Sequence, residues 1–365
     1  MTENIVCKFG GRSIANSQAV AIIKSILDNN SKRKVIVVSA PGEIKEGDVR
    51  VTDSLIKLAN IKPTQDAEYN LNILNSIDSL IERYRPLAPN RDSLGEIGKE
   101  LIKRINEYED SPAHIDAVKA FGEEACARIL SESLGYEFVD TKELFLVSSD
   151  FGNARILPES EQMIKDRLKN PEKVYIVPGF YGFTKEGKRA TFSRGGSDLT
   201  GAYIATALDS EVYENFTDTD GVFSADPRII DSPRKIDVMT YNELRDLAYS
   251  GFSVFHDEAV EPVRNKGIRV HIRNTFNFPN EGTYIVSERL SDSKRPIVGV
   301  AYKEGFCSFE LGFFGLNSMV GLTARIANIF AEQGVSIEYI TTAIDDMAFI
   351  VQRDQLINKN NKLSS

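Results

Sequence analysis

Residues 191–230 read TFSRGGSDLTGAYIATALDSEVYENFTDTDGVFSADPRII, and their pattern predicts a loop, a helix, a strand and a second loop. Gly195 and Gly196 precede the predicted helix and allow the backbone to come close to an anion. Ser197 or Asp198 is expected to cap the helix, and an acidic residue suits the positive end of the helix dipole. This first half of the stretch therefore predicts a helix N-terminus that suits an anionic ligand.

The second half of the stretch contains a short apolar strand, residues 212–216, which runs directly into Thr217 and Asp218. A loop at the carboxyl end of a strand is the place where open α/β sheets bind their ligands. An ordinary surface turn would explain either loop by itself. Two polar loops around one helix–strand unit favour a ligand site in an α/β fold.

A second candidate anion site lies near the start of the sequence. Residues 5–9 predict a buried strand, Gly10 and Gly11 turn the chain, and an apolar helical pattern follows. Lys8 thus stands at a strand end beside glycine amides and a helix start, which suits a polyphosphate. This is not a P-loop, because the lysine precedes the glycines. A solvated lysine at a strand end is the alternative interpretation.

Composition narrows the class of protein. The 365 residues are 42% hydrophobic and 27% charged, which is ordinary for a soluble globular chain of about two domains. A net charge of −9 argues against nucleic-acid and membrane partners. Three cysteines without a C-x-x-C pair and three scattered histidines favour neither a disulfide framework nor a metal centre. Because no signal peptide or membrane-spanning run is evident, the chain is expected to be cytoplasmic.

Several motifs together carry a resemblance to a known family. RGGSD at 194–198, TDTDGVFSADPRII at 217–230 and KFGGRSIAN at 8–16 resemble the aspartate kinases (aspartokinases) of the amino acid kinase superfamily. The resemblance implies a three-layer αβα sandwich with a mostly parallel central sheet. It also implies phosphorylation of the side-chain carboxylate of L-aspartate by ATP and Mg²⁺. The product, 4-phospho-L-aspartate, is the first intermediate on the way to lysine, threonine and methionine.

The same resemblance implies a substrate subsite assembled from distant parts of a catalytic domain at residues 1–290. Ser39 ends a predicted apolar strand, and residues 53–134 predict a helical insert. In that insert Glu123 matches the family's glutamate that holds the substrate ammonium, and Glu124 is expected to be its solvated neighbour. The residues expected to bind aspartate are Ser39, Thr52, Glu123, Phe180 and Arg194, the last through the α-carboxylate.

The implied reaction depends on neutralising charge, because a carboxylate is already a nucleophile at pH 7. Lys8 is expected to face the phosphates, and Asp198 to orient Lys8 and a Mg²⁺-bound water. The sequence departs from the family pattern at Arg12, Ser253 and Asp257. The residues expected to bind the nucleotide are Lys8, Gly10, Gly11, Thr217, Asp218, Phe223, Arg228, Ser253 and Val254.

Residues 297–365 resemble an ACT domain, a small ferredoxin-like module that senses amino acids, because a strand, a helix and two strands are predicted in that order. The sequence stops at Ser365, where the second helix of such a module is expected, so the domain is expected to be truncated and to respond weakly. The resemblance implies a homo-oligomer paired through these modules, with L-lysine or L-threonine as effector. A plain dimerisation module is the alternative. The expected effector residues are Ser318, Met319, Leu322, Thr323, Ile337 and Glu338.

Two other functions remain open at this point. Glutamate 5-kinase and acetylglutamate kinase share the lysine–glycine opening, but neither is expected to combine RGGSD with an ACT segment. A non-catalytic amino-acid-sensing subunit is favoured by the three departures from the family pattern. The presence of Lys8, Arg194 and Asp198 opposes it.

Overall fold

The computed structural model describes residues 4–15, 18–43, 47–62, 67–107, 109–193, 195–249, 255, 259–290 and 297–356. The chain divides into two compact units, residues 1–301 and 302–365. Each unit has an apolar core of its own, and each is described separately below.

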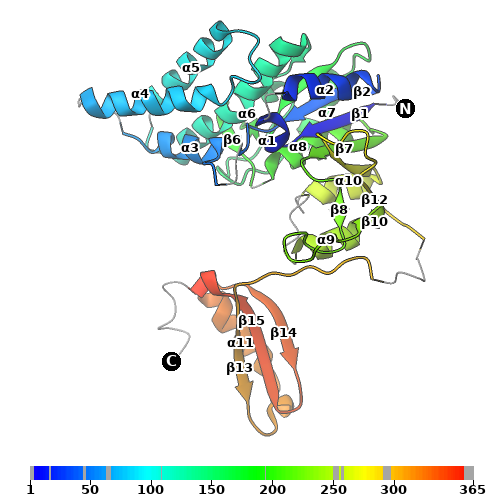
Figure 1. Ribbon diagram of the computed structural model, residues 1–365. Coiled ribbons are helices and arrows are strands. Elements are labelled where there is room, and N and C mark those ends of the chain that lie inside the picture. The colour runs from blue at the N-terminus through cyan, green and yellow to red at the C-terminus, as the bar shows by residue number, and fades with distance from the viewer. Residues whose placement is uncertain are drawn as a thin grey trace. The chain divides into compact units, whose positions relative to one another are not determined.

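The first unit is built on a sheet whose strands lie in the order β10-β12-β11-β7-β1-β2-β4-β3 within the described residues. Strands β1, β2, β7, β10 and β12 of this sheet are labelled in Figure 1. Every neighbouring pair is parallel except β11 and β12. The central strand β1 is buried along its whole length, as expected for a parallel strand covered on both faces. The strands are β1 (Ile5–Phe9), β2 (Arg33–Val38), β3 (Glu137–Phe138), β4 (Tyr175–Pro178), β7 (Val212–Thr217), β10 (Val238–Thr240), β11 (Arg269–Asn274) and β12 (Thr283–Val286).

Helices cover both faces of this sheet. On β1, Cys7 and Phe9 belong to one apolar cluster and Val6 to the other, because successive residues of a strand point to opposite faces. The first cluster includes α1 to α6 and the second includes α7 to α10, so the predicted three-layer αβα sandwich is confirmed. The helices are α1 (Gly11–Ala15), α2 (Ala19–Asp28), α3 (Val51–Ala59), α4 (Ala67–Glu82), α5 (Arg91–Asn106), α6 (Pro112–Leu134), α7 (Glu159–Arg167), α8 (Gly196–Ala207), α9 (Tyr241–Tyr249) and α10 (Val260–Lys266). Among the helices described, none is long and apolar enough to cross a membrane.

Helix α6 connects the helical insert to the sheet. It begins at a Ser111 cap whose side chain accepts from the His114 amide, and it ends at Gly135, which adopts φ +71°. Gly122 in its middle lets the helix approach the end of β2, since a Cβ there would lie 3.0 Å from the Ala40 Cβ. The glycine therefore allows a close approach between this helix and the sheet.

Two small two-stranded sheets complete the first unit. The hairpin formed by β5 (Tyr181–Phe183) and β6 (Arg189–Thr191) follows β4 and leads the chain toward α8. The second pair consists of β8 (Val222–Phe223) and β9 (Lys235–Ile236).

The second unit has the predicted strand–helix–strand–strand order in its described residues. Its strands form an antiparallel sheet in the order β13-β15-β14, with one helix packed on it. The elements are β13 (Phe306–Gly312), a short 3₁₀ turn (Leu316–Ser318), α11 (Leu322–Glu332), β14 (Ile337–Thr342), β15 (Asp346–Gln352) and a last 3₁₀ turn (Arg353–Leu356). Its core consists of Leu316, Phe330, Val335, Met347, Phe349, Val351 and Leu356.

Candidate active site

A cavity of about 500 Å³ lies at the carboxyl ends of β1 and β2, beside the start of α8. Helices α3 and α6 of the insert supply its other walls. Six of the residues predicted from sequence to bind substrate or to take part in catalysis line this one cavity, although they come from six separate segments. They are Lys8, Ser39, Thr52, Glu123, Phe180 and Asp198.

Lys8 and Asp198 form an ion pair at the base of this cavity. The Lys8 Nζ lies 2.6 Å from the Asp198 Oδ1, and each side chain is about one-tenth exposed. The Asn215 amide donates to the same oxygen at 2.9 Å. A pair of opposite charges held this way keeps the ammonium in one position, so Lys8 can meet an anion without first becoming ordered.

The start of α8 differs from the prediction. The capping residue is Gly195, in the left-handed region at φ +80°, and neither Ser197 nor Asp198 caps the helix. Asp198 belongs to the first helical turn, where its carboxylate faces Lys8 instead of the helix amides. Gly196 is required for packing, since a Cβ there would lie 2.8 Å from the Phe180 ring.

The two glycines after Lys8 close the other side of the base. The Gly10 amide donates to the Phe216 carbonyl at 3.0 Å, which joins the turn to the end of β7. Gly11 lines the cavity, and a Cβ on it would lie 2.8 Å from the Ala40 carbonyl oxygen. The KFGG stretch therefore packs its backbone directly against two neighbouring strand ends.

Glu123 is a buried carboxyl group on the cavity wall. Only 5% of the residue is exposed, and its Oε1 accepts a 3.1 Å hydrogen bond from the Ala40 amide. Its Oε2 has no hydrogen-bond partner in the described part of the chain. Burial raises the pKa of Glu123 to about 8. A buried carboxyl with an unused oxygen is suited to a cationic ligand, whose charge would make ionisation favourable again.

Glu124 corrects the prediction made for it, because it is buried and not solvated. Its carboxylate accepts from Arg104 at 2.9 Å and Arg128 at 2.8 Å, and lies 3.2 Å from an Arg189 nitrogen. Burial raises the pKa of Glu124, but the three arginines outweigh burial and leave that pKa below its usual range. Adjacent carboxylates on one helix thus face different surroundings.

Arg12 bridges the cavity to the loop after β7. Its guanidinium donates to the Asp218 Oδ2 at 2.8 Å and lies 3.5 Å from a Glu43 oxygen. Arg50 holds the same Glu43 carboxylate at 3.0 Å. The side chain that departs from the family pattern at position 12 therefore connects the predicted nucleotide loop with the loop after β2.

Other predicted nucleotide residues lie outside the cavity lining. Thr217 ends β7 and donates to the Asp218 carboxylate, while Phe223 lies at the end of β8. The Arg228 side chain is 84% exposed and pairs with Asp226 at 2.6 Å. The structure therefore does not bring Arg228 to the cavity. Three predicted residues lie outside the described part of the chain: Arg194, Ser253 and Val254.

The predicted effector residues lie in two places of the second unit. Ser318 and Met319 end the 3₁₀ turn, and Leu322 begins α11. Thr323 contacts Met347 through its hydroxyl, 3.8 Å from the sulfur. Ile337 and Glu338 begin β14.

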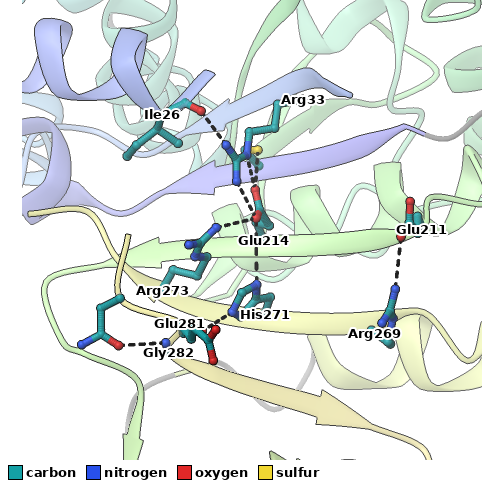
Figure 2. A network of polar contacts seen from close by, with 11 residues as sticks. Ile26, Arg33, Glu211, Glu214, Arg269, His271, Arg273, Glu281 and Gly282 are labelled. Carbon is teal, nitrogen blue, oxygen red and sulfur yellow. Dashed lines mark hydrogen bonds and ion pairs between the residues drawn. The ribbon is translucent and has the colours of Figure 1, made fainter. Parts of the chain in front are cut away.

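A buried polar network supports β7 behind the cavity. Glu214 on β7 accepts two hydrogen bonds from Arg33, at 2.6 and 2.9 Å, and one from Arg273 at 3.1 Å (Figure 2). Burial raises the pKa of Glu214, yet the two arginines keep that pKa below its usual value. His271 lies 3.9 Å from the same carboxylate, and burial lowers the pKa of His271 to about 4, so its ring is neutral. The network fixes β7 immediately before the Thr217 loop.

A larger cavity of about 680 Å³ lies between α5 and α6, around Glu124 and Arg128. Its buried Glu124 carboxylate is neutralised by the three arginines, and its lining includes no residue of 8–11, 178–180 or 195–198. Size by itself does not make it the reactive site. The smaller cavity is the candidate active site, because its lining includes an ordered cation and a residue with an unsatisfied carboxyl oxygen.

Lys119 is a charged residue of the cavity lining that was not predicted from sequence. Lys119 lies on α6, four residues before Glu123, and lines the same cavity. Residues four apart share a helix face, so a site position for Lys119 could have been predicted from the site position of Glu123.

This chain is similar to known proteins in sequence and in fold. The model of the amino acid kinase family matches residues 3–274. Aspartokinase 3 of Bacillus subtilis is 38% identical over 363 residues, which cover 96% of this chain and 78% of the Bacillus protein. The crystal structure of Clostridium acetobutylicum aspartate kinase matches with a TM-score of 0.84 at 31% identity, over 98% of this chain and 81% of that one. Escherichia coli aspartokinase III in complex with lysine and aspartate matches with a TM-score of 0.74 at 23% identity, over 98% and 83%, which is a likeness of fold.

Proposed function

Because the chain belongs to the aspartokinases, within the amino acid kinase family, we infer that it transfers the γ-phosphoryl group of ATP to the side-chain carboxylate of L-aspartate. The products are ADP and 4-phospho-L-aspartate, which opens the aspartate pathway. The observation that carries this inference is the one cavity lined both by the Lys8–Asp198 pair and by Glu123, whose carboxyl has an unsatisfied oxygen.

The chemistry requires no general base. A free carboxylate has a pKa of about 4 and is ionised at pH 7. Asp198 is already engaged by Lys8 and Asn215, which suits an orienting role and not proton abstraction. The obstacle is repulsion between an anionic acceptor and a polyanion, and Lys8 together with the amides at the start of α8 reduces it.

Glu123 suits the ammonium group of L-aspartate. Its Oε2 is buried without a partner, and an incoming ammonium would both bond to it and favour its ionised form. Ser39, Thr52 and Phe180 line the remaining wall of the same space. We keep Arg194 as a partner of the α-carboxylate on the basis of the family resemblance.

Mg²⁺ would reach this site with the nucleotide. The described residues contain no cluster of three or more His, Cys, Asp or Glu side chains able to hold a metal ion. This suits Mg²⁺, which usually takes most of its ligands from phosphate and water and only one or two from carboxylates. Asp198 is the carboxylate beside Lys8 that would orient a metal-bound water. When bound, the ion neutralises charge on the phosphate oxygens.

The nucleotide would extend from Lys8 toward the loop after β7. Gly10 joins these two places through its hydrogen bond to Phe216, and Arg12 joins them through Asp218. Thr217, Asp218 and Phe223 then suit contacts to the sugar or base. We place the activity in the cytoplasm, since Cys7, Cys126 and Cys307 are free thiols that suit a reducing compartment.

The second unit suits a regulatory role. Its strand–helix–strand–strand order is that of the first part of an ACT domain, and we propose L-lysine or L-threonine as its effector and a homo-oligomer as its assembly. The solved E. coli relative was crystallised with lysine, which supports this choice. Calorimetric titration of both amino acids tests it, and unchanged lysine inhibition in Glu338→Ala would argue against the proposed effector residues.

An acceptor panel tests the activity. ADP release is measured with L-aspartate, L-glutamate or N-acetyl-L-glutamate as acceptor, and we expect turnover with L-aspartate only. Turnover with either of the other acceptors would point to a different kinase of the family. Binding of L-aspartate without any turnover would support the non-catalytic sensing subunit.

A further inference from the structure

Lys119 is a cation on the wall of the active-site cavity with no assigned role. Its side chain is 13% exposed, and its Nζ lies 3.0 Å from the Asp116 Oδ1 and 2.8 Å from the Thr191 Oγ1. No other acceptor contacts this ammonium in the described part of the chain. A lysine ammonium has three donors, so one remains for a ligand in the cavity.

The counterion of Lys119 lies outside the cavity lining. Asp116 is 2% exposed, and its other oxygen accepts from the backbone amides of Gly152 and Thr191, both at 2.7 Å. Asp116 thus joins α6 to two chain segments. By contrast, Lys8 and Arg50 pair with carboxylates that themselves line the cavity, namely Asp198 and Glu43. Lys119 therefore presents positive charge to the ligand space while its partner lies behind it.

The position of Lys119 relative to Glu123 suits an amino acid head group. Residues four apart on a helix share a face, with Cβ atoms about 5–6 Å apart. Opposite charges at that spacing match an ammonium and a carboxylate that are attached to the same carbon atom. The Lys119 Nζ also lies 5.6 Å from the centroid of the Phe180 ring, so the aromatic side chain borders the same place.

We propose that Lys119 binds the α-carboxylate of L-aspartate while Glu123 binds its ammonium. This assignment rests on the proposed function. Lys119 and Glu123 would hold the α-carbon of the substrate beside α6. The side-chain carboxylate of the substrate would then be directed toward Lys8 and the phosphates. A carboxylate accepts up to about four hydrogen bonds, so Arg194 and Lys119 can share it. Lys119 is therefore a substrate-binding and specificity-determining residue.

A purely structural role is the alternative, in which Lys119 only neutralises Asp116. The two roles differ in what they predict for a ligand that lacks the α-carboxylate charge. The test compares two ligands, L-aspartate and L-aspartate α-amide. The affinity of each ligand is measured by calorimetry with the parent enzyme and with Lys119→Met, which gives a thermodynamic cycle of four affinities. Lys119→Gln is a second variant that keeps hydrogen-bonding capacity toward Asp116 and Thr191 if the apolar one fails to fold. Lys103→Met on α5, a lysine that is 67% exposed, is the matched control.

We expect Lys119→Met and Lys119→Gln to lower the affinity for L-aspartate by about 10- to 100-fold, which is the usual effect of losing a hydrogen bond to a charged group. The affinity for L-aspartate α-amide should fall by less than about threefold, and the KM for ATP should stay unchanged. Equal losses for the two ligands would overturn the assignment, because a structural defect does not distinguish them. If the parent enzyme turns over L-aspartate but the cycle shows no coupling between Lys119 and the α-carboxylate, only the Lys119 assignment fails. If the parent neither binds nor phosphorylates L-aspartate, the proposed function fails and the assignment falls with it.

Discussion

Aspartate binding should release a proton from the enzyme near neutral pH. The pKa of Glu123 in the empty site is raised to about 8 by burial, so at pH 7 about nine in ten molecules carry a protonated Glu123. The ammonium of L-aspartate at the Glu123 Oε2 favours the ionised form and expels that proton. We therefore predict release of up to about one proton per aspartate at pH 7, and a smaller release as the pH rises through about 8.

The same shift makes stability of the empty enzyme depend on pH. Because the folded-state pKa lies above the unfolded value, the contribution of Glu123 is full below pH 4.5 and is lost as pH rises through about 8. One pKa unit corresponds to about 1.4 kcal/mol, so the loss amounts to at most roughly 5 kcal/mol. Glu123→Gln, which stays neutral, should remove this dependence and be more stable than the parent above pH 8.

Calorimetry in two buffers with different ionisation enthalpies measures the released proton directly. The slope of the observed binding enthalpy against the buffer enthalpy gives the number of protons exchanged. Glu123→Gln is the matched control and should show a slope near zero, with weaker aspartate binding. A slope near zero for the parent at pH 7, or equal slopes for the parent and the variant, would refute the assignment of the ammonium to Glu123.

Three further predictions concern charged residues of the first unit. Lys8→Ala should lower kcat by at least about 100-fold with an unchanged circular dichroism spectrum, because a fixed cation is lost where charge develops; near-normal turnover would exclude the phosphate role. Arg12→Thr should raise the KM for ATP several-fold and leave the KM for aspartate unchanged, since the pair with Asp218 at 2.8 Å is lost; steady-state kinetics with each substrate varied decides this. Arg33→Met should destabilise the fold by about 3–5 kcal/mol in urea denaturation, because it leaves the buried Glu214 carboxylate short of its strongest partner; a loss below about 1 kcal/mol would contradict the network.

The gathering of Lys8, Ser39 and Asp198 could be predicted from sequence because it follows from topology. Lys8 and Ser39 stand at the carboxyl ends of adjacent parallel strands, and such ends meet at one edge of a sheet. Asp198 belongs to the helix that precedes β7, the other neighbour of β1. Local patterns were sufficient for these positions.

The surroundings of Glu124 could not be predicted in this way. Glu124 is buried because arginines from three different places converge on it, among them Arg189 from β6. The predicted cap of α8 was also wrong, because Asp198 pairs with Lys8 from β1 and not with the helix amides. In each case a long-range ion pair outweighs the local preference, and one sequence does not reveal which distant charges meet.

In the proposed reaction, the side-chain carboxylate of L-aspartate attacks the γ-phosphorus of ATP in the cavity around Lys8. The most direct measurement uses L-aspartate labelled with ¹⁸O in that carboxylate and mass analysis of the phosphate freed when hydroxylamine cleaves the acyl phosphate at carbon. If the carboxylate attacks phosphorus, the bridging oxygen stays with phosphate, and we predict one ¹⁸O atom in each phosphate. Hydroxamate should form at least about 100-fold more slowly with Lys8→Ala. Unlabelled phosphate, or release of ADP without any hydroxamate, would contradict the account.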